Sequence, residues 1–83
     1  MRRGPKNDEL RAILTEARIA KGLTQTQLAK KLDRPQAMVS NYERGQRRID
    51  VGEFIEIAGL LGLDPVAIIR RLVVGEAESS PAL

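Results

Sequence analysis

The chain has 83 residues, of which 42% are hydrophobic and 30% charged, and it contains neither cysteine nor histidine. This length corresponds to one small domain, below the usual size of about 100–150 residues. Without cysteine and histidine, zinc fingers, thiol redox chemistry and Ser-His-Asp catalysis are excluded. No apolar run approaches the roughly 20 residues of a membrane span, and the basic start is not followed by a signal-peptide core. We therefore expect a cytoplasmic protein.

The charge is divided unevenly along the chain. Residues 1–48 hold twelve Lys and Arg against five Asp and Glu, a net charge of +7, whereas residues 49–83 hold two against six, a net of −4. The basic first half favours a nucleic-acid partner, and the acidic second half favours contact with a partner of another kind. A single Tyr and a single Phe cannot form the aromatic platforms on which single-stranded bases stack, so the expected nucleic acid is duplex.

Apolar residues recur at helical spacing throughout, and no stretch alternates as a strand does. Two capping boxes, Thr24–Gln27 and Asp50–Glu53, open the second and fourth helices. With their caps, the predicted helices run from Asn7–Asp8 to Lys21, from Thr24 to Asp33, from Gln36 to Arg44, from Asp50 to Gly62 and from Asp64 to Val74. This predicts an all-α domain of five helices over residues 8–75, which Gly75 ends. A basic leader, 1–7, precedes it and an acidic flexible tail, 76–83, follows.

The second and third predicted helices are joined by only about three residues, which forces them to cross steeply as a helix-turn-helix. The small and apolar positions of this unit have the spacing that such a crossing needs: Leu28, Ala29, Leu32, Val39 and Tyr42. Ala29 leaves room for the following helix to approach.

The chain resembles the lambda-repressor-like (Xre-type) helix-turn-helix family over about residues 10–72. The matching residues are Arg18, Gly22-Leu23-Thr24-Gln25, Leu28-Ala29-Lys30-Lys31-Leu32, Val39-Ser40, Tyr42-Glu43-Arg44-Gly45, Ile57-Ala58 and Leu61-Gly62-Leu63. It departs from the family in the turn, where Asp33, Arg34 and Pro35 replace a glycine, an apolar residue and a Ser or Thr. Because the turn position needs a positive φ, we predict a left-handed backbone at Asp33.

The resemblance implies that the third helix enters the major groove of double-stranded DNA with its N-terminus first. Gln36, Ala37 and Asn41 would then face base edges, and Met38 and Ser40 would lie at the margin. The amide of Gln25 would meet a phosphate at the start of the second helix. Arg44, Arg47 and Arg48 would contact further phosphates, which fixes register and affinity but not sequence.

Other charged residues are expected to have structural roles. The resemblance places Arg18 and Glu43 where the family forms a partly buried ion pair. The acidic pair Glu53 and Glu56 is interpreted as an exposed helix face and not as a general acid and base.

The sequence therefore predicts a DNA-binding transcription repressor that binds a two-fold symmetric operator as a homodimer. Val66, Ile69 and Val73 of the last helix are either core residues or the dimer contact. The alternative is a protein-interaction module, such as an antitoxin, whose acidic C-terminal half binds a protein partner. No nucleophile–base pair, metal cluster or phosphate loop indicates an enzyme, and no cofactor is expected.

Overall fold

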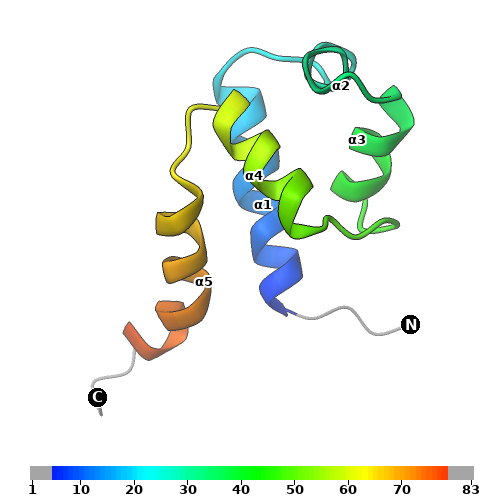
Figure 1. Ribbon diagram of the computed structural model, residues 1–83. Coiled ribbons are helices and arrows are strands. Elements are labelled where there is room, and N and C mark those ends of the chain that lie inside the picture. Colours follow the sequence, from blue (N-terminus) through cyan, green and yellow to red (C-terminus); the bar gives the residue numbers. More distant parts are fainter. Residues whose placement is uncertain (1–4, 79–83) are drawn as a thin grey trace.

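The computed structural model describes residues 5–78, with side chains up to Val74, and contains five α-helices (Figure 1). They are α1 (Pro5–Ala20), α2 (Gln25–Leu32), α3 (Gln36–Glu43), α4 (Val51–Leu60) and α5 (Pro65–Glu78). Residues 5–78 form no strand, which confirms the all-α prediction. The first residues of the predicted leader and the last five of the predicted tail lie outside the described residues. Within the described part, no helix combines the length and the apolar character needed to cross a bilayer.

The helix-turn-helix and α5 lie on opposite sides of the molecule. α1 contacts α3 and α5, and α4 contacts α2 and α5, so α1 and α4 form the middle of the fold. Figure 1 shows α2 and α3 on the right of these two helices and α5 on the left. The α2–α3 unit is thus supported from behind and is open to solvent on its outer side.

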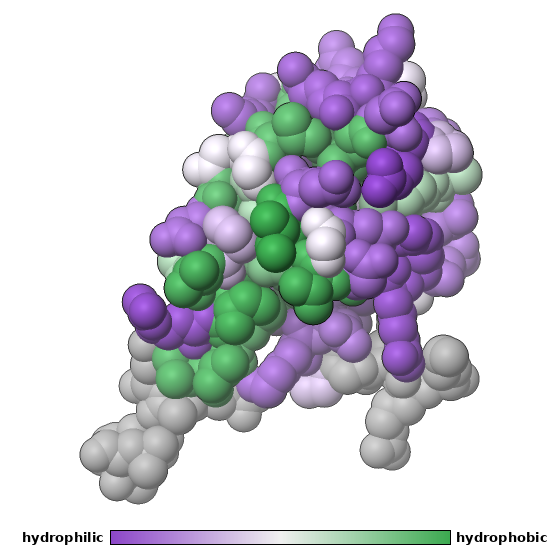
Figure 2. All heavy atoms as spheres, in the orientation of Figure 1, coloured by the Kyte–Doolittle hydropathy of each residue, from purple (hydrophilic) through white to green (hydrophobic). Residues whose placement is uncertain are grey.

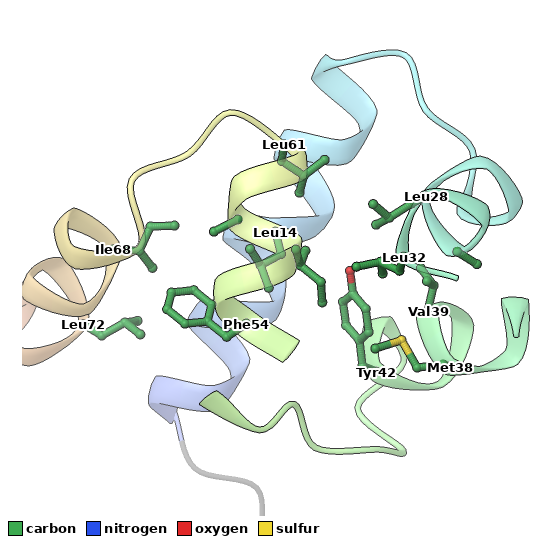
Figure 3. Packing of buried hydrophobic residues seen from close by; sticks show 13 residues of the cluster. Leu14, Leu28, Leu32, Met38, Val39, Tyr42, Phe54, Leu61, Ile68 and Leu72 are labelled. Carbon is green, nitrogen blue, oxygen red and sulfur yellow. The ribbon is translucent and has the colours of Figure 1, made fainter. Parts of the chain in front are cut away.

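One hydrophobic core joins all five helices. Its completely buried side chains are Leu14, Leu28, Val39, Tyr42, Ile57 and Ala58. Figure 3 shows Phe54 of α4 between this centre and two residues of α5, Ile68 and Leu72, which are buried as well. The residues predicted to face inward in α2 and α3 are all buried, so the predicted helical faces are confirmed.

The two predicted capping boxes are both present. The Thr24 hydroxyl accepts from the Gln27 amide at 3.0 Å, and the Gln27 side chain accepts from the Thr24 amide at 2.9 Å. The Asp50–Glu53 box has the corresponding distances of 2.8 and 3.2 Å. Each box satisfies amide groups that have no partner inside the helix.

Two predicted helix limits are wrong. Asn7 and Asp8 do not cap α1, because the helix already includes Pro5 and both residues lie in its first turn. Gly75 does not end α5, which continues to Glu78. An isolated glycine costs a helix only about 1 kcal/mol relative to alanine, so it ends the helix only when the next residues favour another path.

The turn between α2 and α3 has the left-handed backbone that was predicted at Asp33, with φ 58° and ψ 46°. The amide of Asp33 donates to the carbonyl of Lys30 at 3.1 Å, and the amide of Arg34 donates to that of Ala29 at 3.0 Å. These two bonds form a Schellman motif. α1, α3 and α4 end with the same pair of bonds, but with glycine at the left-handed position.

Substitution of Asp33 therefore tests the strain at the turn. Asp33→Gly should stabilise the protein by about 0–1 kcal/mol, because relief of the left-handed strain is partly offset by the greater freedom of the unfolded chain. Asp33→Val should destabilise it by at least about 1 kcal/mol. Thermal melts measure both changes, with Lys31→Val as the control for a β-branched residue in the adjacent helical turn. Equal stability of the Asp33→Val variant and the parent would contradict a strained turn.

Candidate nucleic-acid interface

The outer face of α3 presents four of the predicted interface residues. Gln36 and Ala37 are exposed, and Ser40 and Asn41 are half-buried beside them, one turn further along. Pro35 precedes the helix with an extended backbone and provides no side-chain cap, so the start of α3 is not covered by a capping residue. This end of the helix is open to an incoming ligand.

Met38 is arranged differently from the other predicted interface residues. Its side chain is only 7% exposed and lies in the core next to Tyr42 (Figure 3). Burial of this kind gives Met38 a packing role, because its side chain faces the core and not the solvent side of α3.

A continuous chain of hydrogen bonds leads from α1 to the exposed end of α3. Arg18 donates to both carboxylate oxygens of Glu43, with its Nε at 2.7 Å from Oε2 and its Nη2 at 3.0 Å from Oε1. The Gln25 Nε2 donates to the same Oε1 at 2.9 Å, and the Gln36 Nε2 donates to the Gln25 Oε1 at 3.0 Å. The predicted contact between Arg18 and Glu43 is thus confirmed. It extends through Gln25 to Gln36, a link that the sequence analysis missed.

The direction of this chain is fixed by chemistry. A carboxylate only accepts hydrogen bonds, so Gln25 must turn its amide nitrogen toward Glu43 and its oxygen toward Gln36. Gln36 must then donate with its nitrogen, which leaves its oxygen and its second amide hydrogen available on the solvent side. The amide of Gln36 is therefore held in one of its two orientations.

The ion pair at the base of this chain is largely buried. The Arg18 and Glu43 side chains are 11% and 6% exposed. The hydrogen bond to Glu43 raises the pKa of Arg18 and outweighs the opposing effect of burial, so Arg18 remains charged. The neighbouring Tyr42 is completely buried, its hydroxyl has no hydrogen-bond partner among the described residues, and burial raises its pKa.

The three predicted phosphate-binding arginines lie in different surroundings. Arg44 donates to the Asn41 side chain at 3.1 Å, and Arg48 is exposed. Arg47 donates to both carboxylate oxygens of Glu53, at 2.8 and 2.6 Å, so the greater part of its guanidinium is occupied within the protein.

The prediction that Glu53 lies on an exposed face is wrong, because its side chain is only 11% exposed. Its place in the capping box turns the carboxylate back toward the preceding loop, where it meets Arg47. That hydrogen bond lowers the pKa of Glu53 from its ordinary value of 4.5. Its ionised form therefore stabilises the fold above pH 4.5, and this contribution is lost as the pH falls through the lowered pKa. Glu56 is exposed, as predicted.

Comparison with known proteins identifies the class to which this fold and surface belong. Residues 14–68 match a protein family described as Helix-turn-helix. The structure of an XRE-family like protein from Pseudomonas syringae pv. tomato str. DC3000 is similar, with 41% identity, a TM-score of 0.78, and coverage of 90% of this chain and 88% of that one. The comparison with curated proteins gives no match. The chain belongs to the lambda-repressor-like (Xre-type) helix-turn-helix family of DNA-binding regulators.

Another similar structure is that of the restriction-modification controller protein C.Esp1396I. It has 22% identity and a TM-score of 0.75, with coverage of 86% of this chain and 93% of that one. A further structure contains the same controller as a tetramer in complex with its natural 35 base-pair operator, with 22% identity, a TM-score of 0.74 and the same coverage. At this identity the likeness concerns the fold.

The Arg18–Glu43 pair can be tested for its contribution to stability. Because the pair is buried, Arg18→Ala or Glu43→Ala leaves one charge without its partner and should cost about 3–5 kcal/mol of unfolding free energy. The double variant should lose much less than the sum of the two single losses. Urea unfolding of the four proteins measures the coupling. The exposed pair Arg34–Glu56, with 3.5 Å between its charged atoms, is the control and should show at most about 1 kcal/mol.

Proposed function

We propose that the chain is a transcription repressor that binds a two-fold symmetric operator in double-stranded DNA as a homodimer. The observation that carries the proposal is the fixed amide of Gln36, which lies exposed at the start of α3 and is anchored through Gln25 to the buried Arg18–Glu43 pair. A rigid amide at the end of a helix is suited to reading a base, because little side-chain freedom is lost when it binds.

Gln36 is the proposed reader of base sequence. Its free oxygen and second amide hydrogen match the donor and acceptor that adenine presents in the major groove. Ala37 next to it offers a methyl group that fits against thymine, and Asn41 extends the polar surface one turn along. Gln25, at the first position of α2, lies where a phosphate would meet both its amide and the start of that helix.

The proposed phosphate contacts are Arg44 and Arg48, which flank the exposed face of α3. They lie on the connection that leaves α3 and carry charge without base-reading geometry, so they would add affinity on any sequence. Met38 is left out of the interface because it is buried, and Arg47 is left out because its guanidinium is bonded to Glu53.

The proposed dimer contact is the outer face of α5. Val66, Ile69 and Val73 are 62, 46 and 65% exposed and follow one another at helical spacing. Figure 2 shows the hydrophobic surface that gathers over α5 at the lower left, away from α2 and α3. A second copy of the chain fits this stripe, because a two-fold contact pairs the stripe with itself and leaves both α3 helices exposed.

The alternative, an antitoxin-like module with a protein partner on the acidic half, stays a prediction. The same α5 stripe would be the surface available to such a partner. Co-purification of a basic protein that prevents DNA binding would favour it over the dimer.

Selection from random duplex DNA tests the repressor proposal. The selected sequences should contain two inverted half-sites about one helical turn apart, roughly 10 base pairs. Ile69→Glu should convert the dimer to a monomer in analytical ultracentrifugation and abolish selection of the paired site. Ile55→Glu, an equally exposed apolar position on α4, is the control and should change neither result. A single half-site would contradict the dimer, and no enrichment would contradict DNA recognition.

Two substitutions separate base reading from phosphate binding. Gln36→Ala should weaken binding to the selected site by about 1–3 kcal/mol and have little effect on random DNA. Arg48→Ala should weaken both alike and reduce the salt dependence. For the parent dimer, log affinity should fall with log salt at a slope of about −4 to −8. Fluorescence anisotropy over a salt series measures these quantities. Equal losses on both DNAs for Gln36→Ala would show that this residue reads no base.

A further inference from the structure

The connection between α3 and α4, residues 44–50, is held by backbone bonds in its first part and, in its second part, by the packing of Ile49 against the core and by the side chain of Glu53 of α4. Its first part is fixed by backbone bonds, from the Gly45 amide to the Tyr42 carbonyl and from the Gln46 amide to the Asn41 carbonyl. Beyond Gln46, no further backbone–backbone bond is found for the amides of 47–50 within the described residues. Among the described residues, the side-chain hydrogen bonds of this second part all involve Glu53 or Arg47, while the Asp50 carbonyl accepts from the Phe54 amide at 2.9 Å.

The guanidinium of Arg47 connects Glu53 to the backbone of the connection. Its Nη1 is 2.8 Å from the Glu53 Oε1 and 3.0 Å from the carbonyl oxygen of Arg48, and its Nη2 is 2.6 Å from the Glu53 Oε2. The same Oε1 accepts from the amide of Asp50 at 3.2 Å. Arg48, the cation proposed to contact a phosphate, thus lies between Arg47 and Asp50, which are both hydrogen-bonded to the buried carboxylate of Glu53.

We propose that Glu53, acting through the fork of Arg47, is a positioning residue that holds the Arg48 backbone in place for the DNA phosphates. The inference rests on the proposed DNA binding and changes the role predicted for Arg47 from a phosphate contact to an internal brace. A cation on a loose connection loses conformational freedom when it binds, and a brace already present in the free protein avoids that loss.

The proposal predicts the effects of two conservative variants on DNA affinity. Glu53→Gln retains a capping-box side chain but removes the charge, and it should weaken binding by about fivefold or more. Arg47→Lys keeps the positive charge but has no fork, and it should weaken binding as much as Glu53→Gln does. The double variant should be no weaker than either single one, because both remove the same brace.

A matched control separates the brace from general charge effects. Glu56→Gln removes the same charge from an exposed position on α4 and should leave affinity unchanged or slightly higher. All measurements are made at a temperature at which circular dichroism shows each variant to be fully folded, so loss of stability does not lower the affinity.

Three results would overturn the proposal. Tighter binding by Glu53→Gln would show that the carboxylate competes with DNA for Arg47. Parent-like affinity of Arg47→Lys would show that the arginine acts by charge alone. Hydrogen exchange of the amides of 47–50 in the free protein provides the third test, since Glu53→Gln should speed it and unchanged exchange contradicts the brace. If the parent binds no duplex, the proposed function fails, and this exchange measurement still decides whether Glu53 holds the connection.

Discussion

The arrangement of the helix-turn-helix depends on the buried ion pair between Arg18 and Glu43. Two charges removed from water lose much of their hydration, and only a close and fully bonded partner offsets that loss. The two bonds at 2.7 and 3.0 Å provide such a partner. Arg18 also donates to the carbonyl of Leu23 at 2.7 Å, so one guanidinium joins α1, the connection to α2 and the end of α3. The outward surface of α2 and α3 is attached to the rest of the fold through the bonds of Arg18 and Glu43.

A second arginine–carboxylate pair with two hydrogen bonds follows α3 along the chain. Arg47 and Glu53 repeat the fork-to-carboxylate contact between the α3–α4 connection and the start of α4. In both pairs the carboxylate also accepts from a further group, the amide of Gln25 in one and the backbone of Asp50 in the other. Both acidic side chains are nearly buried, and both act at the C-terminal end of α3 and on the connection that follows it.

The parts of the structure that depend on local chemistry were predictable from the sequence. Capping residues such as Thr24 follow from rules that act over a few residues, and the left-handed position at Asp33 was predicted from the resemblance to a family that has glycine in this turn. The contacts of Glu53 and the burial of Met38 were not predictable in this way, because they depend on how segments approach one another. The sequence did contain one signal for Glu53, since a capping box turns its third side chain back toward the preceding loop. The length of α5 was missed because a glycine permits a helix end but does not require one.

The fixed direction of the hydrogen-bond chain limits how this surface can evolve. Because Gln25 offers its oxygen, only a side chain that can donate keeps the hydrogen bond at position 36, and a glutamate there would present another acceptor oxygen without a hydrogen. Acidic side chains are the ones that read the amino group of cytosine. If Gln36 reads a base as proposed, a change to an acidic reader of cytosine would lose the hydrogen bond to Gln25, although the Arg18–Glu43 pair could stay in place. In the proposed interface, new specificity is therefore more accessible at Ala37 and Asn41, which lie outside the chain of hydrogen bonds.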